Sequence, residues 1–281
     1  MFQKLALLVT VVAATGVGAA TAHAANARTW VSGTGTSNST CSRTEPCALF
    51  SQALAVTASG GEIDCLDPGS FGTVTINTPL TIDCEGASNG GITVTGAESA
   101  GISVTATGGV NLIGLDISSN GNTLDFGVSI GAAAANVTVR NCKIYGFNAG
   151  ILMNAGTLVA DNVLITNNVY GIENLSTSGA ANLTVRNSTI SNNGNGISLT
   201  LGGGTHAGAT IEQTTLAFND TGLQVQNAGA IALIGSSTVV NNGTGVSQSS
   251  GGVIYSFKNN QIGGNSTDGT PLTAYPGGPL N

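Results

Sequence analysis

Few side chains in this sequence combine the type and the spacing that acid–base or metal chemistry requires. Asp64 and Asp83 each stand in an Ile-Asp-Cys triplet, and Asp67 and Glu85 follow closely. Calcium binds several carboxylate and carbonyl oxygens at once, so the two triplets form a candidate calcium site if the chain brings them side by side. The simpler interpretation, which we favour, is that outward carboxylates keep one end of the molecule soluble. No other cofactor is predicted.

The remaining candidates for ligand chemistry are a lysine and a few aromatic residues. Lys143 is a lone candidate for the base of a lyase, and the spacing shows no partner for it. Aromatic rings can stack on the apolar face of a sugar, and the rings available for this are Trp30, Tyr145, Tyr170 and Tyr255. His206 is the one histidine outside the first 24 residues, and its glycine-rich surroundings (202–208) predict a loop residue rather than a base. Lys143, Tyr145 and Tyr170 are the candidate ligand-binding residues.

Five cysteines lie after the first 24 residues, and in an oxidising compartment they can pair. Cys41 and Cys47 bracket a short polar loop and are expected to form a disulfide. Cys65 and Cys84 close the two Ile-Asp-Cys triplets, so they could also pair if the triplets stack, and that pairing stays open. Cys142 is left over. No Cys or His cluster has the spacing of zinc ligands.

The first 24 residues resemble a secretory signal. Lys4 precedes an apolar run that ends near Gly18, and Ala22-His23-Ala24 is a small-residue cleavage motif. We therefore expect a secreted or periplasmic protein with no membrane span in the mature chain. The net charge is −7 and becomes more negative when Lys4 is removed, which disfavours nucleic acid as a partner.

An internal repeat organises most of the chain. Its aliphatic anchors are Ile144, Ile165, Ile190, Leu216 and Val239. Each anchor is followed six residues later by a glycine, namely Gly150, Gly171, Gly196, Gly222 and Gly245. Three residues after the anchors stand Asn168, Asn193, Asn219 and Asn242, with Phe147 as the exception. Three residues before them stand Asn141, Asn162, Asn187, Gln213 and Ser236.

This pattern predicts a solenoid of stacked coils. Short runs such as 137–139 and 183–185 alternate apolar with polar residues, as half-buried strands do. One coil cannot bury its apolar face alone, so successive coils must stack. We expect the asparagine and glycine columns to serve turns, because both residues tolerate left-handed backbone. Stacked asparagines can also hydrogen-bond from coil to coil.

Charged residues occupy one register of the repeat. Four residues before the anchors, the charges alternate in sign through Arg140, Asp161, Arg186 and Glu212. Residues at one register of adjacent coils are neighbours, so this column predicts an external ion ladder that helps to align the coils.

Blocks such as 187–197 resemble the repeat of the right-handed parallel β-helix proteins of the pectin-lyase-like superfamily. A short helix over 46–59, followed by 61–69, resembles the cap through which such chains enter the first coil. The fold class implied is an all-β, single-stranded, right-handed parallel β-helix with a short N-terminal capping helix. Handedness follows from the resemblance and from the right-handed crossover rule. The expected organisation is a leader (1–24), a cap with a disulfide loop and helix (25–62), β-helix coils (63–263) and a C-terminal tail (264–281).

The resemblance leaves three functions open. The superfamily contains polysaccharide lyases, hydrolases and epimerases that use carboxylate clusters, often with calcium, and a basic residue. Here the carboxylates are scarce and the arginines are used by the ladder, so we favour a non-catalytic β-helix that presents a polar surface to a polysaccharide or a cell-envelope component. The alternatives are a divergent polysaccharide-acting enzyme and a structural or adhesive spacer.

Overall fold

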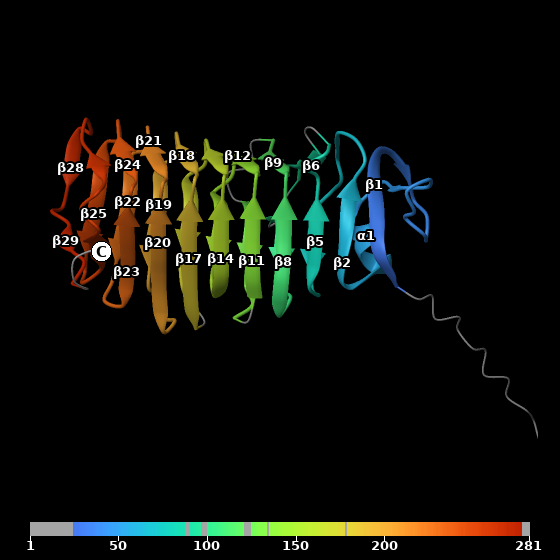
Figure 1. Ribbon diagram of the computed structural model, residues 1–281, viewed down its shortest axis with the longest axis horizontal. Coiled ribbons are helices and arrows are strands. Elements are labelled where there is room, and N and C mark those ends of the chain that lie inside the picture. Colours follow the sequence, from blue (N-terminus) through green and yellow to red (C-terminus); the bar gives the residue numbers. More distant parts are fainter. Residues whose placement is uncertain are drawn as a thin grey trace, which may run out of the picture.

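The protein is a solenoid in which three parallel sheets run along one long axis (Figure 1). The computed structural model describes residues 25–87, 90–96, 100–120, 125–133, 135–177 and 179–276. The predicted leader lies outside the described residues. Each coil passes through one strand of sheet A, one of sheet B and one of sheet C before it returns to sheet A.

The strands pair only with strands of neighbouring coils, in parallel. Sheet A contains β1 (Asn26–Thr36), β2 (Thr57–Cys65), β5 (Leu80–Asp83), β8 (Gly108–Ile113), β11 (Ala135–Arg140), β14 (Gly156–Asp161), β17 (Ala180–Arg186), β20 (His206–Glu212), β23 (Ala230–Gly235), β26 (Val253–Ser256) and β29 (Thr273–Ala274). Sheet B contains β3 (Gly69–Ser70), β6 (Gly90–Val94), β9 (Asp116–Ser119), β12 (Lys143–Tyr145), β15 (Leu164–Thr166), β18 (Thr189–Ser191), β21 (Thr215–Ala217), β24 (Thr238–Val240) and β27 (Gln261–Ile262). Sheet C contains β4 (Val74–Ile76), β7 (Ala100–Val104), β10 (Phe126–Ile130), β13 (Ala149–Met153), β16 (Tyr170–Asn174), β19 (Asn195–Thr200), β22 (Thr221–Gln226), β25 (Thr244–Ser249) and β28 (Thr267–Gly269).

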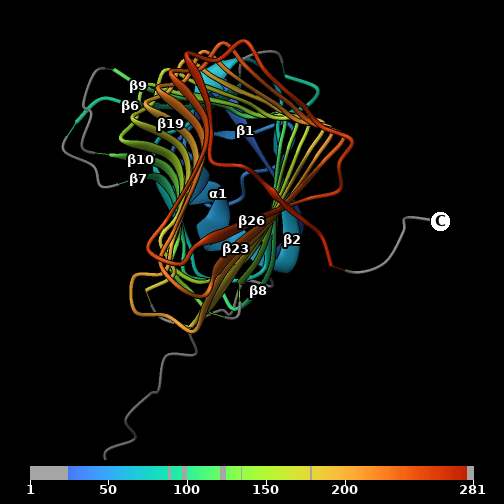
Figure 2. The same cartoon turned by 90° about the vertical axis from the view of Figure 1, so that its left-hand side faces the viewer.

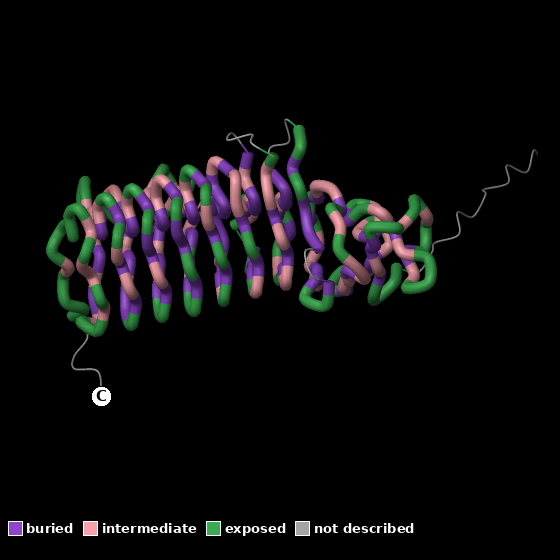
Figure 3. Tube along the Cα trace, turned by 90° about the horizontal axis from the view of Figure 1, so that it is seen from above, coloured by how far each residue is buried: buried purple, intermediate pink, exposed green. Residues whose placement is uncertain are grey.

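The core is a set of aliphatic columns along the axis. The predicted anchors lie in sheet B and pair in register from coil to coil, Ile144 with Ile165, then Ile190, Leu216 and Val239. All five are fully buried. Viewed along the axis, the strands of successive coils superpose around this core (Figure 2), and buried positions recur at the same places in each coil (Figure 3). The predicted stacking of inward faces is confirmed.

The turn from sheet A to sheet B depends on a left-handed residue, as predicted. Asn141, Asn162 and Asn187 have φ between 53° and 55°, and Gln213 and Ser236 take φ of 48° and 50° at the same position. Asparagine adopts this conformation more readily than most side chains, which explains its recurrence here.

The next residue of that turn points inward and bonds to the neighbouring coil. The Val163 N–H donates to Ser188 Oγ at 3.2 Å, and the Leu115 N–H lies 3.4 Å from Cys142 Sγ. Cys142 therefore occupies a position that serine or threonine fills in other coils. Burial raises the pKa of its thiol to about 12, so it is a structural residue rather than a reactive one.

The turn from sheet B to sheet C contains a buried asparagine ladder. Each side-chain amide donates to Oδ1 of the asparagine in the following coil, from Asn168 to Asn193, Asn219, Asn242 and Asn265, over 2.9 to 3.0 Å. The ladder ends at Asp268, which accepts from Asn265, and at Phe147, whose backbone N–H donates to Asn168. The expected bonding between stacked asparagines is confirmed, and the Phe147 side chain is buried.

The glycine column has a different cause from the one expected. Gly150, Gly171, Gly196, Gly222 and Gly245 lie inside sheet C strands, and none has a left-handed φ. A Cβ on Gly171 would lie 2.5 Å from the Gly196 carbonyl oxygen and 2.6 Å from Ile190 Cγ2. The assignment of this column to turns is wrong, because these glycines are needed for the close approach of the coils.

The N-terminal end is closed by a short helix and two disulfides. Helix α1 (Phe50–Val56) is shorter than the predicted 46–59, because Thr57 already begins β2 and pairs with β1. Cys41 pairs with Cys47 and Cys65 with Cys84, with Cα atoms 4.8 and 4.7 Å apart. No helix among the described residues is long and apolar enough to cross a membrane.

Strands also extend beyond the predicted boundaries of the coils. β1, from the predicted cap, belongs to sheet A, while β28 and β29 lie within the segment predicted as a tail. A weak repeat pattern at both ends hid these strands, and pairing with the neighbouring coil forms them.

Loss of one asparagine from the ladder should destabilise the protein. Asn193→Ala leaves the buried N–H of Asn168 without its acceptor, so we expect the free energy of unfolding to fall by about 1 to 3 kcal/mol. Urea denaturation followed by circular dichroism measures this. Asn136→Ala, at an exposed position of β11, is the matched control. Equal losses in the two variants would show that the ladder does not stabilise the fold.

An added methyl group in the glycine column should strain the stack. Gly171→Ala forces two coils apart, and overpacking of this kind typically costs about 1 to 3 kcal/mol. Gly131→Ala is the control, because no atom lies within 4 Å of its added Cβ. Differential scanning calorimetry should show a lower melting temperature for Gly171→Ala only. A melting temperature equal to that of Gly131→Ala would contradict the close-approach explanation.

Candidate functional site

The alternating charges form one column on the outer face of sheet A. Arg140, Asp161, Arg186 and Glu212 pair in register at the ends of β11, β14, β17 and β20. Within this column Arg186 forms an ion pair with Asp161, over 3.0 Å. Arg140 instead lies 3.9 Å from Glu85, which comes from an earlier coil. Glu212 forms no ion pair with Arg186 in the described structure, so the ladder is partial.

Asp161 is the best-connected carboxylate of the ladder. The Asn187 side chain donates to Oδ1 over 2.9 Å, and Arg186 donates to Oδ2. These bonds, that from Asn187 foremost, lower the pKa of Asp161 below its ordinary value of 3.8. Together they join two coils at one corner of the solenoid.

The predicted calcium pair is adjacent but already engaged. Asp64 and Asp83 are directly paired in β2 and β5. Arg28, on β1, places its guanidinium 2.6 Å from Asp64 and 2.7 Å from Glu62. A cation held on Asp64 would have to displace this arginine, so the pair does not fit a calcium site. Sequence reasoning missed Arg28, because β1 precedes the recognisable repeat.

The carboxylates of this region also accept hydrogen bonds from neighbouring groups. Asp67 accepts hydrogen bonds from Ser32 Oγ and from the Gly33 N–H, both over 2.6 Å. Asp83 accepts from the Glu85 N–H over 2.9 Å. The hydrogen-bonded Asp64 carboxyl raises the pKa of Glu62. In the described ranges no group of three or more His, Cys, Asp or Glu side chains is arranged to hold a metal ion.

Two of the predicted ligand-binding residues meet in a groove on the outer face of sheet B. Lys143 and Tyr145 both lie on β12, and the Lys143 ammonium is 4.4 Å from the centre of the Tyr145 ring. The groove, of about 330 Å³, also contains Ser70, Thr93, Asp116 and Ser118. Asp116 pairs with Lys143 and Ser118 with Tyr145 across adjacent strands. We call this surface the sheet B groove.

The sheet B groove has a mixed polar lining. Ser118 Oγ and Thr93 Oγ1 are 3.4 Å apart, and Ser70 Oγ accepts from the Thr93 N–H over 2.9 Å. A basic, an acidic and three hydroxyl side chains thus come from consecutive coils. Tyr170 does not join them, because it begins β16 in sheet C and lies outside this lining.

A second hollow, on the outer face of sheet A, was not predicted. It measures about 340 Å³ and is lined by residues that include Asn182, Thr184, His206, Thr210 and Leu233. His206 begins β20 and pairs with Ala180, so its prediction as a loop residue is wrong. The glycine-rich segment before it obscured the start of the strand.

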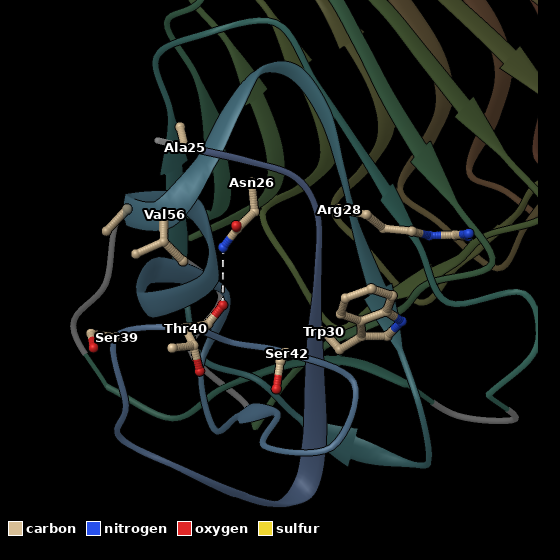
Figure 4. A pocket seen from close by; sticks show the side chains of 9 residues that line it. Ala25, Asn26, Arg28, Trp30, Ser39, Thr40, Ser42 and Val56 are labelled. Atoms are coloured by element: carbon tan, nitrogen blue, oxygen red, sulfur yellow. Dashed lines mark hydrogen bonds between the residues drawn. The ribbon is translucent and has the colours of Figure 1, made fainter. Parts of the chain in front are cut away.

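A smaller pocket of about 260 Å³ lies at the N-terminal cap (Figure 4). Asn26 Nδ2 donates to the Thr40 carbonyl oxygen over 3.1 Å across this pocket. Figure 4 shows Arg28 and Trp30 pointing away from Val56 and Thr40. Because the Arg28 charge is already paired with Glu62 and Asp64, this pocket offers a ligand little beyond hydroxyl and apolar groups.

Comparisons with known proteins agree on the architecture. A family model described as "Right handed beta helix region" matches residues 80–207. The solved structure of pectate lyase Pel9A is similar over 82% of this chain and 74% of its own, with a TM-score of 0.58 and 17% sequence identity. This is a right-handed parallel β-helix repeat protein. The predicted handedness and pectin-lyase-like fold of the β-helix protein are confirmed, and at this identity the likeness shows the fold alone. No curated protein sequence matches the β-helix protein.

The ion pair of the ladder should stabilise the protein in a pH-dependent manner. Arg186→Glu replaces an attraction with a repulsion, so at neutral pH and low salt the melting temperature should fall by an amount equivalent to roughly 1 kcal/mol. Because the folded-state pKa of Asp161 is lowered, its contribution is complete above the ordinary value of 3.8 and is lost as the pH falls through the folded value. The difference from wild type should therefore shrink in acid.

Arg43→Glu provides the control for the change of charge. Arg43 is exposed in the disulfide loop, away from the ladder, and its reversal should leave the melting temperature nearly unchanged. A deficit of Arg186→Glu that persists undiminished at acid pH would show that the Asp161 pair is not its cause.

Proposed function

We propose that the β-helix protein is exported and binds a glycan, without turning it over, through the sheet B groove. The observation that carries the proposal is the convergence of Lys143, Tyr145 and Asp116 with hydroxyl groups from neighbouring coils. Sugars present both hydroxyl groups and an apolar ring face, and this lining offers a partner for each.

The position of Lys143 favours an acidic glycan as the ligand. Its side chain is exposed, and its ammonium lies over the Tyr145 ring rather than in an ion pair with a described carboxylate. A uronate carboxylate can approach this ammonium, while Asp116 and the hydroxyl groups accept and donate hydrogen bonds to the sugar.

The same lining argues for binding over catalysis. Hydrolysis of a glycosidic bond ordinarily uses two carboxylic groups, and the residues that line the groove include one, Asp116. A lyase must both neutralise the uronate carboxylate and remove the neighbouring proton. Lys143 is the single basic side chain in this lining, and one ammonium cannot perform both tasks at once.

A divergent polysaccharide lyase is the second candidate. The observation that favours it is the location of a lysine in a groove of a fold shared with a pectate lyase. In that case Lys143 would be the base, and another group would have to neutralise the substrate carboxylate.

Export is supported by the two disulfides, because such bonds persist outside the reducing cytoplasm. The predicted leader over residues 1–24 is consistent with the same destination. A polysaccharide or envelope component would be met there.

Binding to oligogalacturonate and oligoalginate tests the proposal. Calorimetric titration of the mature protein should detect binding, and Lys143→Gln should weaken it about tenfold, as expected for loss of one charge-assisted contact. Lys258→Gln, which removes an exposed charge outside the groove, is the matched control. Absence of binding, or equal effects of the two substitutions, would refute the proposal.

Ultraviolet absorbance of the same mixtures distinguishes the second candidate. Unsaturated product that accumulates with wild type and is abolished by Lys143→Gln would replace the binding proposal with the lyase. Binding without product supports a non-catalytic protein.

A further inference from the structure

The outer face of sheet A changes character along the solenoid. In β11 and β17 its outward residues are polar, Asn136 and Thr138, then Asn182 and Thr184. In β23 and β26 the same two registers hold large apolar residues, which are Ile231, Leu233, Val253 and Tyr255. All four are partly exposed. The four residues are neighbours in register, and a contiguous exposed apolar patch of this kind marks a surface that contacts a ligand or a partner.

Two further rings extend this apolar end. Tyr275 stands edge-on to Tyr255, with ring centres 6.0 Å apart and planes at 85°, and is tilted at 58° to Phe257 at 5.4 Å. Tyr275 is 43% exposed. The three rings are held against one another, so they offer a ready-made platform with little side-chain freedom left to lose.

A notch separates this platform from the polar part of the face. Gly208 stands in register between Asn182 and Ile231, so the outward column lacks one side chain there. The His206 imidazole lies over this glycine, with Nε2 2.5 Å from the place of a Cβ on Gly208, so the ring takes part of the space of the missing side chain. The hollow of about 340 Å³ described above is formed at this position.

The polar groups around the notch have unused hydrogen-bonding capacity. The Asn182 amide, the Thr184 and Thr210 hydroxyls and the His206 ring form no hydrogen bond with another described side chain or backbone group. The lining residues include no Asp, Glu, Lys or Arg. These donors and acceptors carry no net charge, and the aromatic rings follow one coil beyond Ile231 and Leu233. Such a surface suits an uncharged ligand that has both hydroxyl groups and an apolar face.

We infer that this surface, the sheet A notch with its aromatic platform, is a second binding site that takes a neutral oligosaccharide. One pyranose ring would stack on the exposed Tyr275 or Tyr255 face, and the adjoining residues of the sugar chain would reach Thr210, His206 and Asn182. The polar groups lie on β17 and β20 and the rings begin on β26, with Ile231 and Leu233 of β23 between them. Adjacent coils are about 4.8 Å apart, a repeat comparable to the length of one sugar residue, so the sugar chain runs along the solenoid axis. The site lies on a different sheet from the sheet B groove and does not depend on the proposed function.

Titration with uncharged hexasaccharides tests this site. Cellohexaose, xylohexaose and mannohexaose are offered to the mature protein, and at least one should bind. Tyr275→Ala should then weaken its association about tenfold, the scale expected for loss of one stacked ring. Tyr170→Ala, an equal truncation at the start of β16 in sheet C, should leave the affinity unchanged.

A second variant keeps the test independent of the aromatic rings. Gly208→Ala fills the notch at the cost of moving only the end of the His206 side chain, so the fold should persist. It should also weaken binding of the hexasaccharide. Uronan binding through the sheet B groove should be the same in Tyr275→Ala, Gly208→Ala and wild type.

Three results would overturn the inference. The first is that none of the three sugars binds. The second is that a sugar binds with undiminished affinity to both Tyr275→Ala and Gly208→Ala. In the third, sedimentation shows that the wild type is a dimer which Tyr275→Ala dissociates, so that the face is covered by a second copy instead. Failure of uronan binding alone removes the proposed function and leaves this site standing.

Discussion

Hydrogen bonding between each strand and its equivalent in the next coil is the constraint on which this molecule depends. The coils lie at strand spacing, about 4.8 Å, throughout the three sheets, so a strand residue faces its counterparts in the coils before and after. A side chain fits an inward position when it can pack against the equivalent side chain of the adjacent coil. The buried anchors satisfy this with aliphatic contacts, and the glycines of sheet C satisfy it by having no side chain where the adjacent backbone comes closest.

Polar columns obey the same constraint inside the core. An isolated buried amide would be costly, but in a column each amide finds its acceptor one coil further on. Such a column needs defined ends. Phe147 closes the asparagine ladder on one side by donating its backbone N–H, and Asp268 closes the other side with a carboxylate. Cys142 belongs to a similar column in the other turn, which accounts for an unpaired cysteine in a protein with two disulfides.

Outward side chains need not stack on similar side chains inside the core, so the residues that distinguish this β-helix protein chemically lie on its outer faces. One column on sheet A holds alternating charges, sheet B gathers Lys143, Tyr145 and Asp116, and the last coils of sheet A turn aromatic. Because the solenoid brings consecutive coils to equal spacing, side chains distant in the sequence meet on one face without any special loop.

The sequence by itself determined the repeat, its buried anchors, the left-handed asparagines and the stacking of Asn168 with its successors, because each follows from a short local pattern repeated at fixed registers. It also named Lys143 and Tyr145 as candidate ligand-binding residues, and the structure places both on β12. Only the tertiary structure decided that Arg28 forms an ion pair with Asp64 and that Glu85 forms one with Arg140. It also decided that His206 lies in a strand, with its ring against Gly208. These contacts join coils whose loops differ in length or precede the repeat. Their register is set by backbone pairing across the stack, and no local pattern encodes it.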